Sequence, residues 1–295
     1  MTVIQSLRPS DLDEVALQIA RLQEDPEHHV GYLSLGAEAI AEELAALPGG
    51  PAAAIVAVGG GRPVGLLAAE HSDDPPRVWW HGPFVWAGAE WRAVADRLYT
   101  SARRRLPRHV REEELNPDDR SVRLADFAHA HGFQPERASA VLVLEQPAAV
   151  AGGGDAVAAT DADVADLARL HDDLFPASPT PGARLLATDH PDRTVLVVRR
   201  AGRLAGYVVV ERQAEDQGYI DFVGVRPDLR RRGIGRTLVA GGVAWLHKRG
   251  CTTVSLTVRE TLRAARALYE STGFVEERVL RPWRKGFAVH PAEEG

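Results

Sequence analysis

One segment of this 295-residue chain combines residue types that bind phosphate groups. It runs from Val223 to Leu238 (VGVRPDLRRRGIGRTL) and passes from an apolar stretch through Pro227 and several arginines to Gly233 and Gly235. The first N–H groups of a helix lack intrahelical partners and attract an anion, and glycines let the backbone approach it closely. The arginines add positive charge. The segment therefore predicts a pyrophosphate site at the start of a helix.

Two common phosphate loops do not fit this segment. A Walker A loop ends in Gly-Lys-Ser/Thr, and a dinucleotide fingerprint needs a third glycine after two more residues. Here Gly235 is followed by Arg-Thr-Leu. The spacing Arg230-x-x-Gly233-x-Gly235 instead resembles the acetyl-CoA signature of the GNAT N-acetyltransferase family, Gln/Arg-x-x-Gly-x-Gly/Ala.

A second block, AARALYESTGF, resembles the same family. It fits the pattern Ala-x-x-Leu-Tyr-x-x-x-Gly-Phe through Ala265, Leu268, Tyr269, Gly273 and Phe274. The resemblance implies an α+β (mixed α/β) fold, in which a mixed, mostly antiparallel, splayed sheet is flanked by helices. It also implies an N-acetyltransferase that moves an acetyl group from acetyl-CoA directly to an amine, without a metal.

The resemblance assigns the donor site to particular residues. The backbone of Val223, Gly224 and Val225 is expected to pair with the pantetheine arm as an added strand does. The residues expected to hold the pyrophosphate are Arg230, Arg231, Arg232, Gly233, Ile234, Gly235 and Arg236. One position departs from the family, because Leu262 stands where members often carry Asn, and this puts the fine positioning of the arm in doubt.

Two side chains are candidates for proton transfer. In the family, the tyrosine that corresponds to Tyr269 lies near the thioester sulfur, where a phenol can protonate the departing thiolate. Asp221, on the strand before the loop, is the candidate base for the amine, and Glu211 is a weaker one. By the period of two, Tyr219 and Asp221 share a face unless a bulge intervenes. The alternatives are a packed core role for Tyr269 and an edge or Arg-paired role for Asp221.

The elements that position these residues follow from apolar periodicity and turn residues. For the second half we predict a helix over 161–174, a weaker one over 183–188, strands over 194–198, 204–211 and 219–225, a helix over 233–249, a strand over 253–258, a helix over 262–272, and extended segments over 274–280 and 283–289.

The first half repeats this order. We predict helices over 12–22, 90–106 and 122–131, and strands over 53–58, 63–69, 78–86, 110–115 and 138–145. Such similarity indicates duplication of one domain type. The Gly/Ala-rich stretch 148–155 then links a domain over 1–147 to an acetyl-CoA-binding domain over 156–295.

The first half lacks the residues of the donor site. Its corresponding segment, His81 to Trp91 (HGPFVWAGAEW), has neither arginines nor a Gly-x-Gly pair, and no tyrosine aligns with Tyr269. We expect a degenerate copy that completes the sheet or the acceptor cleft. Its tryptophans are expected in the core or lining a pocket, and His28 and His29 in a surface loop that binds no metal.

Net charge and composition limit the partners, disulfides and cellular location that we expect. A net charge of -6 gives no reason to expect nucleic acid or a membrane surface as partner. The single cysteine, Cys251, excludes an internal disulfide and is expected to be buried. With no leader or long apolar stretch recognised, we expect a cytoplasmic protein. The expected acceptor is a small-molecule amine; a protein or peptide amine, an acyl-CoA sensor without turnover, and monomer or homodimer stay open.

Overall fold

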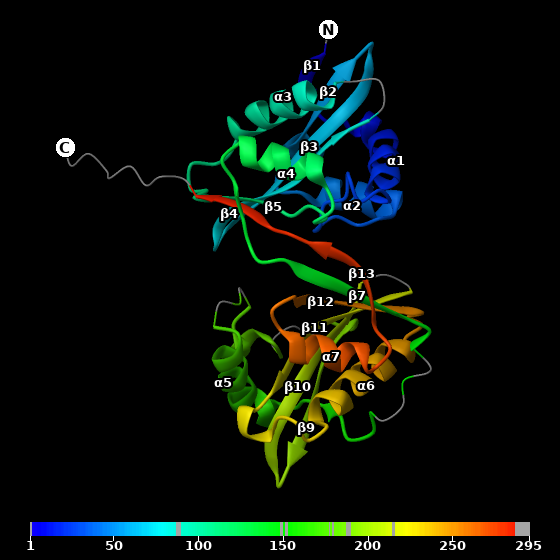
Figure 1. Cartoon of the computed structure of the whole chain (residues 1–295), viewed down its shortest axis with the longest axis vertical. Coiled ribbons are helices and arrows are strands. Elements are labelled where there is room, and N and C mark those ends of the chain that lie inside the picture. Colours follow the sequence, from blue (N-terminus) through cyan, green and yellow to red (C-terminus); the bar gives the residue numbers. More distant parts are fainter. Residues whose placement is uncertain are drawn as a thin grey trace, which may run out of the picture. The chain divides into compact units, whose positions relative to one another are not determined.

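The structure is a computed structural model that describes residues 2–86, 90–147, 150, 153–176, 178, 180–186, 190–213 and 216–286. It divides into two compact units, and Figure 1 shows the chain coloured from blue to red along the sequence. The first unit comprises Met1–Ala138 with Val279–Gly295, and the second comprises Ser139–Arg278. Each unit contains a mixed sheet and its own helices.

The first unit is built on a seven-stranded sheet with the order β1-β2-β3-β4-β5-β14-β6. Its strands are antiparallel except for the parallel pair β4 and β5. The strands are β1 (Val3–Ser6), β2 (Ala54–Gly59), β3 (Arg62–Asp73), β4 (Pro76–Val85), β5 (Glu112–Leu115), β6 (Gln134–Pro135) and β14 (Trp283–Gly286). The helices are α1 (Leu12–Gln23), α2 (Ala37–Ala46), α3 (Trp91–Arg103) and α4 (Val122–Ala130).

The second unit has a seven-stranded sheet with the order β13-β7-β12-β11-β10-β9-β8. Strands β11 and β12 are parallel, whereas β12 with β7, β11 with β10, β10 with β9 and β9 with β8 are antiparallel. The strands are β7 (Ser139–Glu145), β8 (Val157–Ala158), β9 (Arg193–Arg200), β10 (Arg203–Arg212), β11 (Gln217–Val225), β12 (Thr253–Arg259) and β13 (Val275–Leu280). The helices are α5 (Val164–Leu174), α6 (Ile234–His247) and α7 (Arg263–Glu270).

Strand β10 supplies both faces of the second core. Val208 and Val210 lie against Gly242 of α6, where an added Cβ would come within 2.8 Å of a Val210 methyl group. Tyr207 and Val209 belong to a core cluster with residues of α5. Because successive side chains of a strand point to opposite faces, α5 and α6 cover opposite sides of this sheet.

Each sheet receives a strand from the part of the chain predicted for the other domain. Strand β7 follows β6 in sequence but pairs with β12, so that Val141 faces Thr257. Strand β14 follows β13 but pairs with β5 and β6, so that Trp283 faces Leu115. The compact units therefore differ from the predicted division at 148–155. Alternating apolar residues identify a strand, but they do not specify its non-local partner.

Most predicted elements are present within a few residues of their expected ends. The helix expected over 183–188 is instead a 3-10 turn at Gly182–Arg184, with 187 and 188 outside the described residues. Helix α2 was not predicted, although its Ala, Glu and Leu residues are strong helix formers. Of the expected segment 283–289, the structure describes the strand Trp283–Gly286.

Three other expectations concern single residues or helices. Cys251 is fully buried, as predicted, and burial raises the pKa of its thiol. The expectation that His29 lies at the surface is wrong, because its ring is buried and its Nδ1 lies 3.1 Å from the Gln23 carbonyl oxygen. None of the helices in the described part of the chain is long and apolar enough to cross a membrane.

Candidate active site

The sheet of the second unit opens between its two parallel strands. Strands β11 and β12 pair from Gln217 with Thr253 to Ile220 with Leu256. Within the described residues the ladder ends there, although β11 continues to Val225 and β12 continues for three further residues. The backbone of β11 beyond Ile220 therefore has an unpaired edge, which is the kind of edge that an extended ligand can join as an added strand.

A β-bulge places Asp221 at this opening. Val209 of β10 faces Phe222 and Val210 faces Ile220, so Asp221 is the extra residue of β11. The bulge is the exception to the period of two that the sequence analysis allowed for. The Phe222 ring stands edge-to-face with His171 of α5 at 4.7 Å, and the Asp221 carboxylate also interacts with His171. Both side chains are thus on the α5 side of the sheet.

Asp221 is held by an arginine that the sequence analysis did not select. Arg193 Nη2 lies 3.2 Å from Asp221 Oδ2, and Arg193 Nη1 lies 3.1 Å from Glu211 Oε2. Burial raises the pKa of Asp221 above its ordinary value, although Arg193 opposes the shift. Asp221, the predicted base, and Glu211, the weaker candidate, therefore both bond to the Arg193 guanidinium. The structure thus contains the alternative in which Asp221 pairs with an arginine, and the pKa of Asp221 is nevertheless raised. No sequence pattern links three positions on three strands.

Tyr269 lies at the end of α7 and is 8% exposed. Burial, and then the neighbouring Tyr219, raise the pKa of its phenol to about 12, so it is protonated at neutral pH and can donate a proton. Its ring packs edge-to-face on Phe274, with centroids 6.0 Å apart. Burial raises the pKa of Tyr219, and Asp221 adds to the shift. Tyr219 thus interacts electrostatically with both predicted catalytic residues.

A buried histidine and tyrosine form one wall next to Asp221. His171 Nε2 lies 3.0 Å from the Thr180 carbonyl oxygen, which can only accept, so Nε2 carries the proton. Nδ1 then accepts a hydrogen bond of 2.7 Å from the Tyr207 hydroxyl. Burial lowers the pKa of His171 and raises that of Tyr207. This pair was not predicted from the sequence; the signal for it was His171, a polar residue on the apolar stripe of α5.

Gly233 caps the helix that follows the arginine-rich loop. It has φ 80°, the left-handed region in which glycine is favoured, and no atom would crowd an added Cβ there. The Thr237 N–H bonds back to the Gly233 carbonyl at 3.1 Å. Because Thr237 makes the first of these intrahelical bonds, the N–H groups of residues 234–236 have no carbonyl partner within α6. The dipole of α6 favours an anion at this N-terminus.

Gly235 has a reason for its missing side chain that the sequence did not show. An added Cβ would lie 2.9 Å from Leu268 Cδ2, so Gly235 allows α6 and α7 to pack closely. Arg236 joins the same helices, because its Nη2 donates to Ser271 Oγ at 2.9 Å. Arg231 and Arg232 are exposed, and among the described residues neither has a side-chain partner. These two arginines are therefore available to a phosphate.

The corresponding place in the first unit differs. The parallel pairing of β4 with β5 ends at Trp80 and Leu115, where β5 itself ends, whereas β4 continues to Val85. The helix that follows begins after Glu90, whose carboxylate disfavours an anion at a helix N-terminus. Residues 87–89 of the predicted corresponding segment lie outside the described residues. Of the predicted tryptophans, Trp80 is buried and donates to the buried Glu113, Trp86 and Trp91 pack partly buried against the core, and Trp79 is partly exposed.

The sequence is similar to known acetyltransferases. Residues 164–274 match the family model described as Acetyltransferase (GNAT) family. A mycothiol acetyltransferase of Streptomyces coelicolor is 29% identical over 218 residues, covering 74% of this chain and 63% of that protein. The [ribosomal protein bS18]-alanine N-acetyltransferase of Escherichia coli K12 is 38% identical over 80 residues, covering 27% of this chain and 53% of its own length. The chain thus matches about half to two thirds of these relatives.

The fold is similar to solved structures over nearly the whole chain. A GCN5-related N-acetyltransferase from Sphaerobacter thermophilus has a TM-score of 0.72 at 20% identity and covers 97% of this chain and 95% of its own. A tandem GNAT protein from the clavulanic acid biosynthesis pathway has a TM-score of 0.65 at 18% identity, with coverage of 97% and 98%. The predicted α+β fold class, with two mixed sheets flanked by helices, is confirmed.

Proposed function

We propose that the chain is an acetyltransferase of the GNAT family, whose model residues 164–274 match, and that it transfers the acetyl group of acetyl-CoA to the amine of a small molecule. The observation that carries the proposal is the open edge of β11 beyond Ile220, which is followed by the turn Pro227–Leu229, the arginine-rich loop and the glycine-capped N-terminus of α6. This arrangement offers one continuous path for an extended arm that ends in phosphates.

The residues of this path fit the parts of acetyl-CoA. The backbone of Val223, Gly224 and Val225 would pair with the pantetheine arm, as predicted from the sequence. The pyrophosphate would meet the free N–H groups at the start of α6, with the exposed Arg231 and Arg232 adding charge. The thioester would then lie at the opening of the sheet, beside the bulge.

Two side chains can carry out the two proton transfers that the reaction needs, one from the amine and one to the CoA thiolate. The amine nitrogen forms a bond to the thioester carbonyl carbon, and the carbon–sulfur bond breaks. Asp221 accepts the proton that the amine loses, a role to which the burial-raised pKa of its carboxyl is suited. Tyr269, kept protonated by burial, gives a proton to the departing thiolate. Arg193 orients the Asp221 carboxylate through its Nη2.

Two observations support a small-molecule acceptor. The wall beside Asp221 is built of packed rings, with His171 and Phe175 at 5.1 Å and Phe175 and Phe222 at 5.2 Å. The match to the Streptomyces coelicolor mycothiol acetyltransferase extends well beyond the family domain, whereas the match to the alanine N-acetyltransferase covers only 80 residues. The predicted layout, with a degenerate first copy, is also similar to that of mycothiol synthase.

A screen that detects free CoA thiol across amines and peptides tests the proposal. We expect turnover with small amines, and a large loss of turnover in Tyr269→Phe. Binding of CoA without thiol release across the panel would instead favour a sensor, a role suggested by Leu262, which leaves α7 without a side-chain cap. Acetylation of peptides but not of small amines would favour a protein acceptor.

The matched binding control is the double variant Arg231→Glu with Arg232→Glu. Both side chains are exposed, so the exchange leaves the packing intact and places two carboxylates beside the proposed pyrophosphate. We expect this variant to lose acetyl-CoA affinity while keeping its melting temperature. Gly235→Glu is a poorer probe, because it would also collide with Leu268. Retained affinity in the double variant would refute the placement of the donor.

A further inference from the structure

A cavity in the first unit is not used by the proposed reaction. It has a volume of about 250 Å³ and is lined by Tyr32, Leu33, Glu43, Leu44, Ala46, Leu47, Pro48, Glu70 and His81. These residues come from the loop after α1, from α2 and the turn after it, and from β3 and β4. A single water molecule needs only about 10–15 Å³ of such space, so the cavity has room for a small metabolite.

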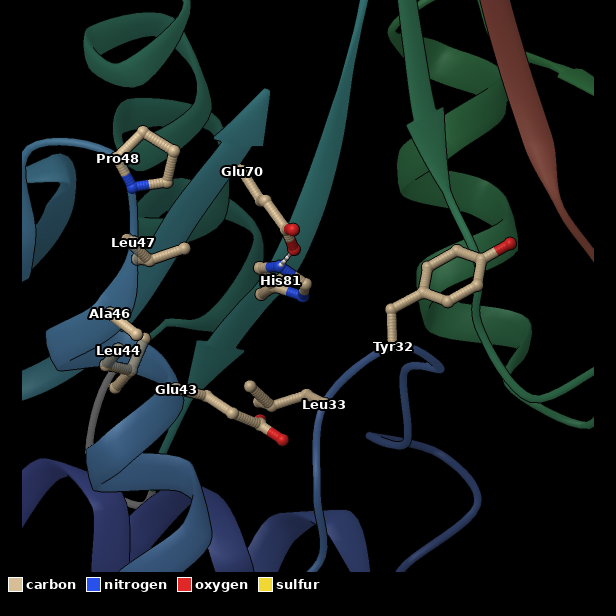
Figure 2. A pocket seen from close by; sticks show the side chains of 9 residues that line it. All are labelled: Tyr32, Leu33, Glu43, Leu44, Ala46, Leu47, Pro48, Glu70 and His81. Atoms are coloured by element: carbon tan, nitrogen blue, oxygen red, sulfur yellow. Dashed lines mark hydrogen bonds and ion pairs between the residues drawn. The ribbon is translucent and has the colours of Figure 1, made fainter. Parts of the chain in front are cut away.

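His81, which lines this cavity, carries an unpaired polar atom. Its side chain is 3% exposed, and its Nε2 lies 3.0 Å from Glu70 Oε2 on the neighbouring strand, as the dashed line in Figure 2 shows. A carboxylate only accepts hydrogen bonds, so Nε2 carries a proton. Nδ1 is buried, and the described residues offer it no hydrogen-bond partner. In the neutral ring this atom presents a lone pair that needs a donor, and such orphaned groups are costly unless a ligand satisfies them.

The charged groups that line the cavity are all negative. Glu70 is about half exposed, and the hydrogen bond from His81 lowers the pKa of its carboxyl. Glu43 extends from α2 and accepts from the Ser34 N–H at 3.0 Å and from the Ser34 hydroxyl. The lining includes no lysine or arginine. The cavity is therefore lined by two carboxylates and by the histidine that carries the unpaired nitrogen, with no cation among its lining residues.

The remaining wall is apolar or already paired. Leu44, Leu47 and Pro48 stand on one side in Figure 2, and Tyr32 stands on the other. The Tyr32 hydroxyl is bonded to the buried Glu114 at 2.9 Å, so its ring rather than its hydroxyl is offered to a ligand. The cavity thus combines a polar, negative end with an apolar side.

We propose that this cavity binds a small molecule that carries an ammonium group on a short apolar body. An N–H of the ligand donates to His81 Nδ1, its charge faces the carboxylates of Glu70 and Glu43, and its carbon atoms pack on the leucines. The site binds without acyl transfer, since the helix after β4 has Glu90 at its N-cap, where α6 of the second unit has Gly233. It is a second ligand site, independent of the acetyl-CoA site.

The test uses three probes of one shape and different charge, added to the full chain without acetyl-CoA. They are cyclohexylamine, cyclohexanol and cyclohexanecarboxylate. Binding is followed through the ¹⁵N signals of the histidine rings, with those of His81 assigned from the spectrum of His81→Gln. We expect cyclohexylamine to shift the His81 Nδ1 signal saturably. Cyclohexanol should bind about tenfold more weakly, because it lacks the charge-assisted hydrogen bonds.

Three variants locate the site. Glu70→Gln should weaken cyclohexylamine binding about tenfold by removing one carboxylate. Ala46→Phe should abolish it by filling the cavity from the exposed end of α2. Glu42→Gln is the matched control, because this exposed carboxylate on α2 does not line the cavity, and binding should be unchanged. Melting curves confirm that each variant folds.

Three results would overturn the proposal: no saturable His81 shift with any probe, preferred binding of cyclohexanecarboxylate, or equal cyclohexylamine affinity in the parent, Glu70→Gln and Ala46→Phe. None of them affects the acyltransferase proposal, since thiol release from acetyl-CoA is measured separately and at the other unit.

Discussion

In the proposed active site, Gly224 of β11 lies directly opposite Tyr207 of β10, and the tyrosine ring covers the space where a side chain at 224 would be. A Cβ added at Gly224 would lie 2.3 Å from Tyr207 Cε1, 2.9 Å from Cζ and 3.0 Å from Cδ1. The ring cannot move aside freely, because it is fully buried and its hydroxyl is bonded to His171 at 2.7 Å. Gly224→Ala should therefore displace Tyr207 and break that hydrogen bond.

The expected cost follows from these two effects. Overpacking a filled core costs about 1–3 kcal/mol. Leaving a buried hydrogen-bonding group unpaired costs about 1–3 kcal/mol more. Gly224→Ala should thus lower the free energy of unfolding of the second unit by roughly 2–6 kcal/mol. Hydrogen exchange of the β10 and β11 amides measures this loss in the second unit by itself.

A double-mutant cycle separates the clash from other effects. In a Tyr207→Leu background the ring atoms are gone, so adding Gly224→Ala should cost less than about 1 kcal/mol. Gly233→Ala is the comparison, because no atom crowds that position but its φ is 80°. It should cost about 1–2 kcal/mol whichever residue stands at 207. Equal costs of Gly224→Ala in both backgrounds would refute the steric explanation.

Three further predictions concern Asp221, Tyr269 and Asp163. Because burial raises the pKa of Asp221, kcat/KM should fall, as the pH is lowered, at a pH above the ordinary carboxyl pKa of about 3.9. Asp221→Asn should remove this inflection, and Arg193→Gln should move it to higher pH because Arg193 lowers the pKa of Asp221; an unchanged pH–rate profile would exclude the base role. Tyr269→Phe should lower kcat by about 10²–10⁴-fold while calorimetry finds acetyl-CoA affinity unchanged, and parallel losses of both would indicate a packing role. Burial by itself raises the pKa of Asp163, but hydrogen bonds from Thr160 and Arg199 hold this pKa below its usual value in the folded protein. The stability that ionised Asp163 contributes is therefore present above its pKa in the unfolded chain and is lost as the pH falls through its pKa in the folded protein, so urea titrations should show Asp163→Asn less stable than the parent at pH 7 and nearly equal to it at low pH.

The proposed donor loop could be inferred from the sequence because the residues that suit a phosphate follow one another along the chain. A strand, a turn and a helix N-terminus follow one another within Val223 to Leu238, and glycine and arginine at fixed spacings suit a phosphate without help from distant parts of the chain. The same holds for the order of helices and strands, since periods of two and of 3.6 residues are local properties.

The rest was decided by contacts between positions far apart in sequence. The bulge that turns Asp221 toward α5 depends on the register between β10 and β11, and Arg193 reaches Asp221 only because β9 joins the same sheet. The pairing of β7 with β12 and of β14 with β5 likewise depends on which edges meet when the chain folds. The sequence by itself determined the helices and strands and the proposed donor-binding segment; strand pairing, a non-local property, determined which side chains stand beside them.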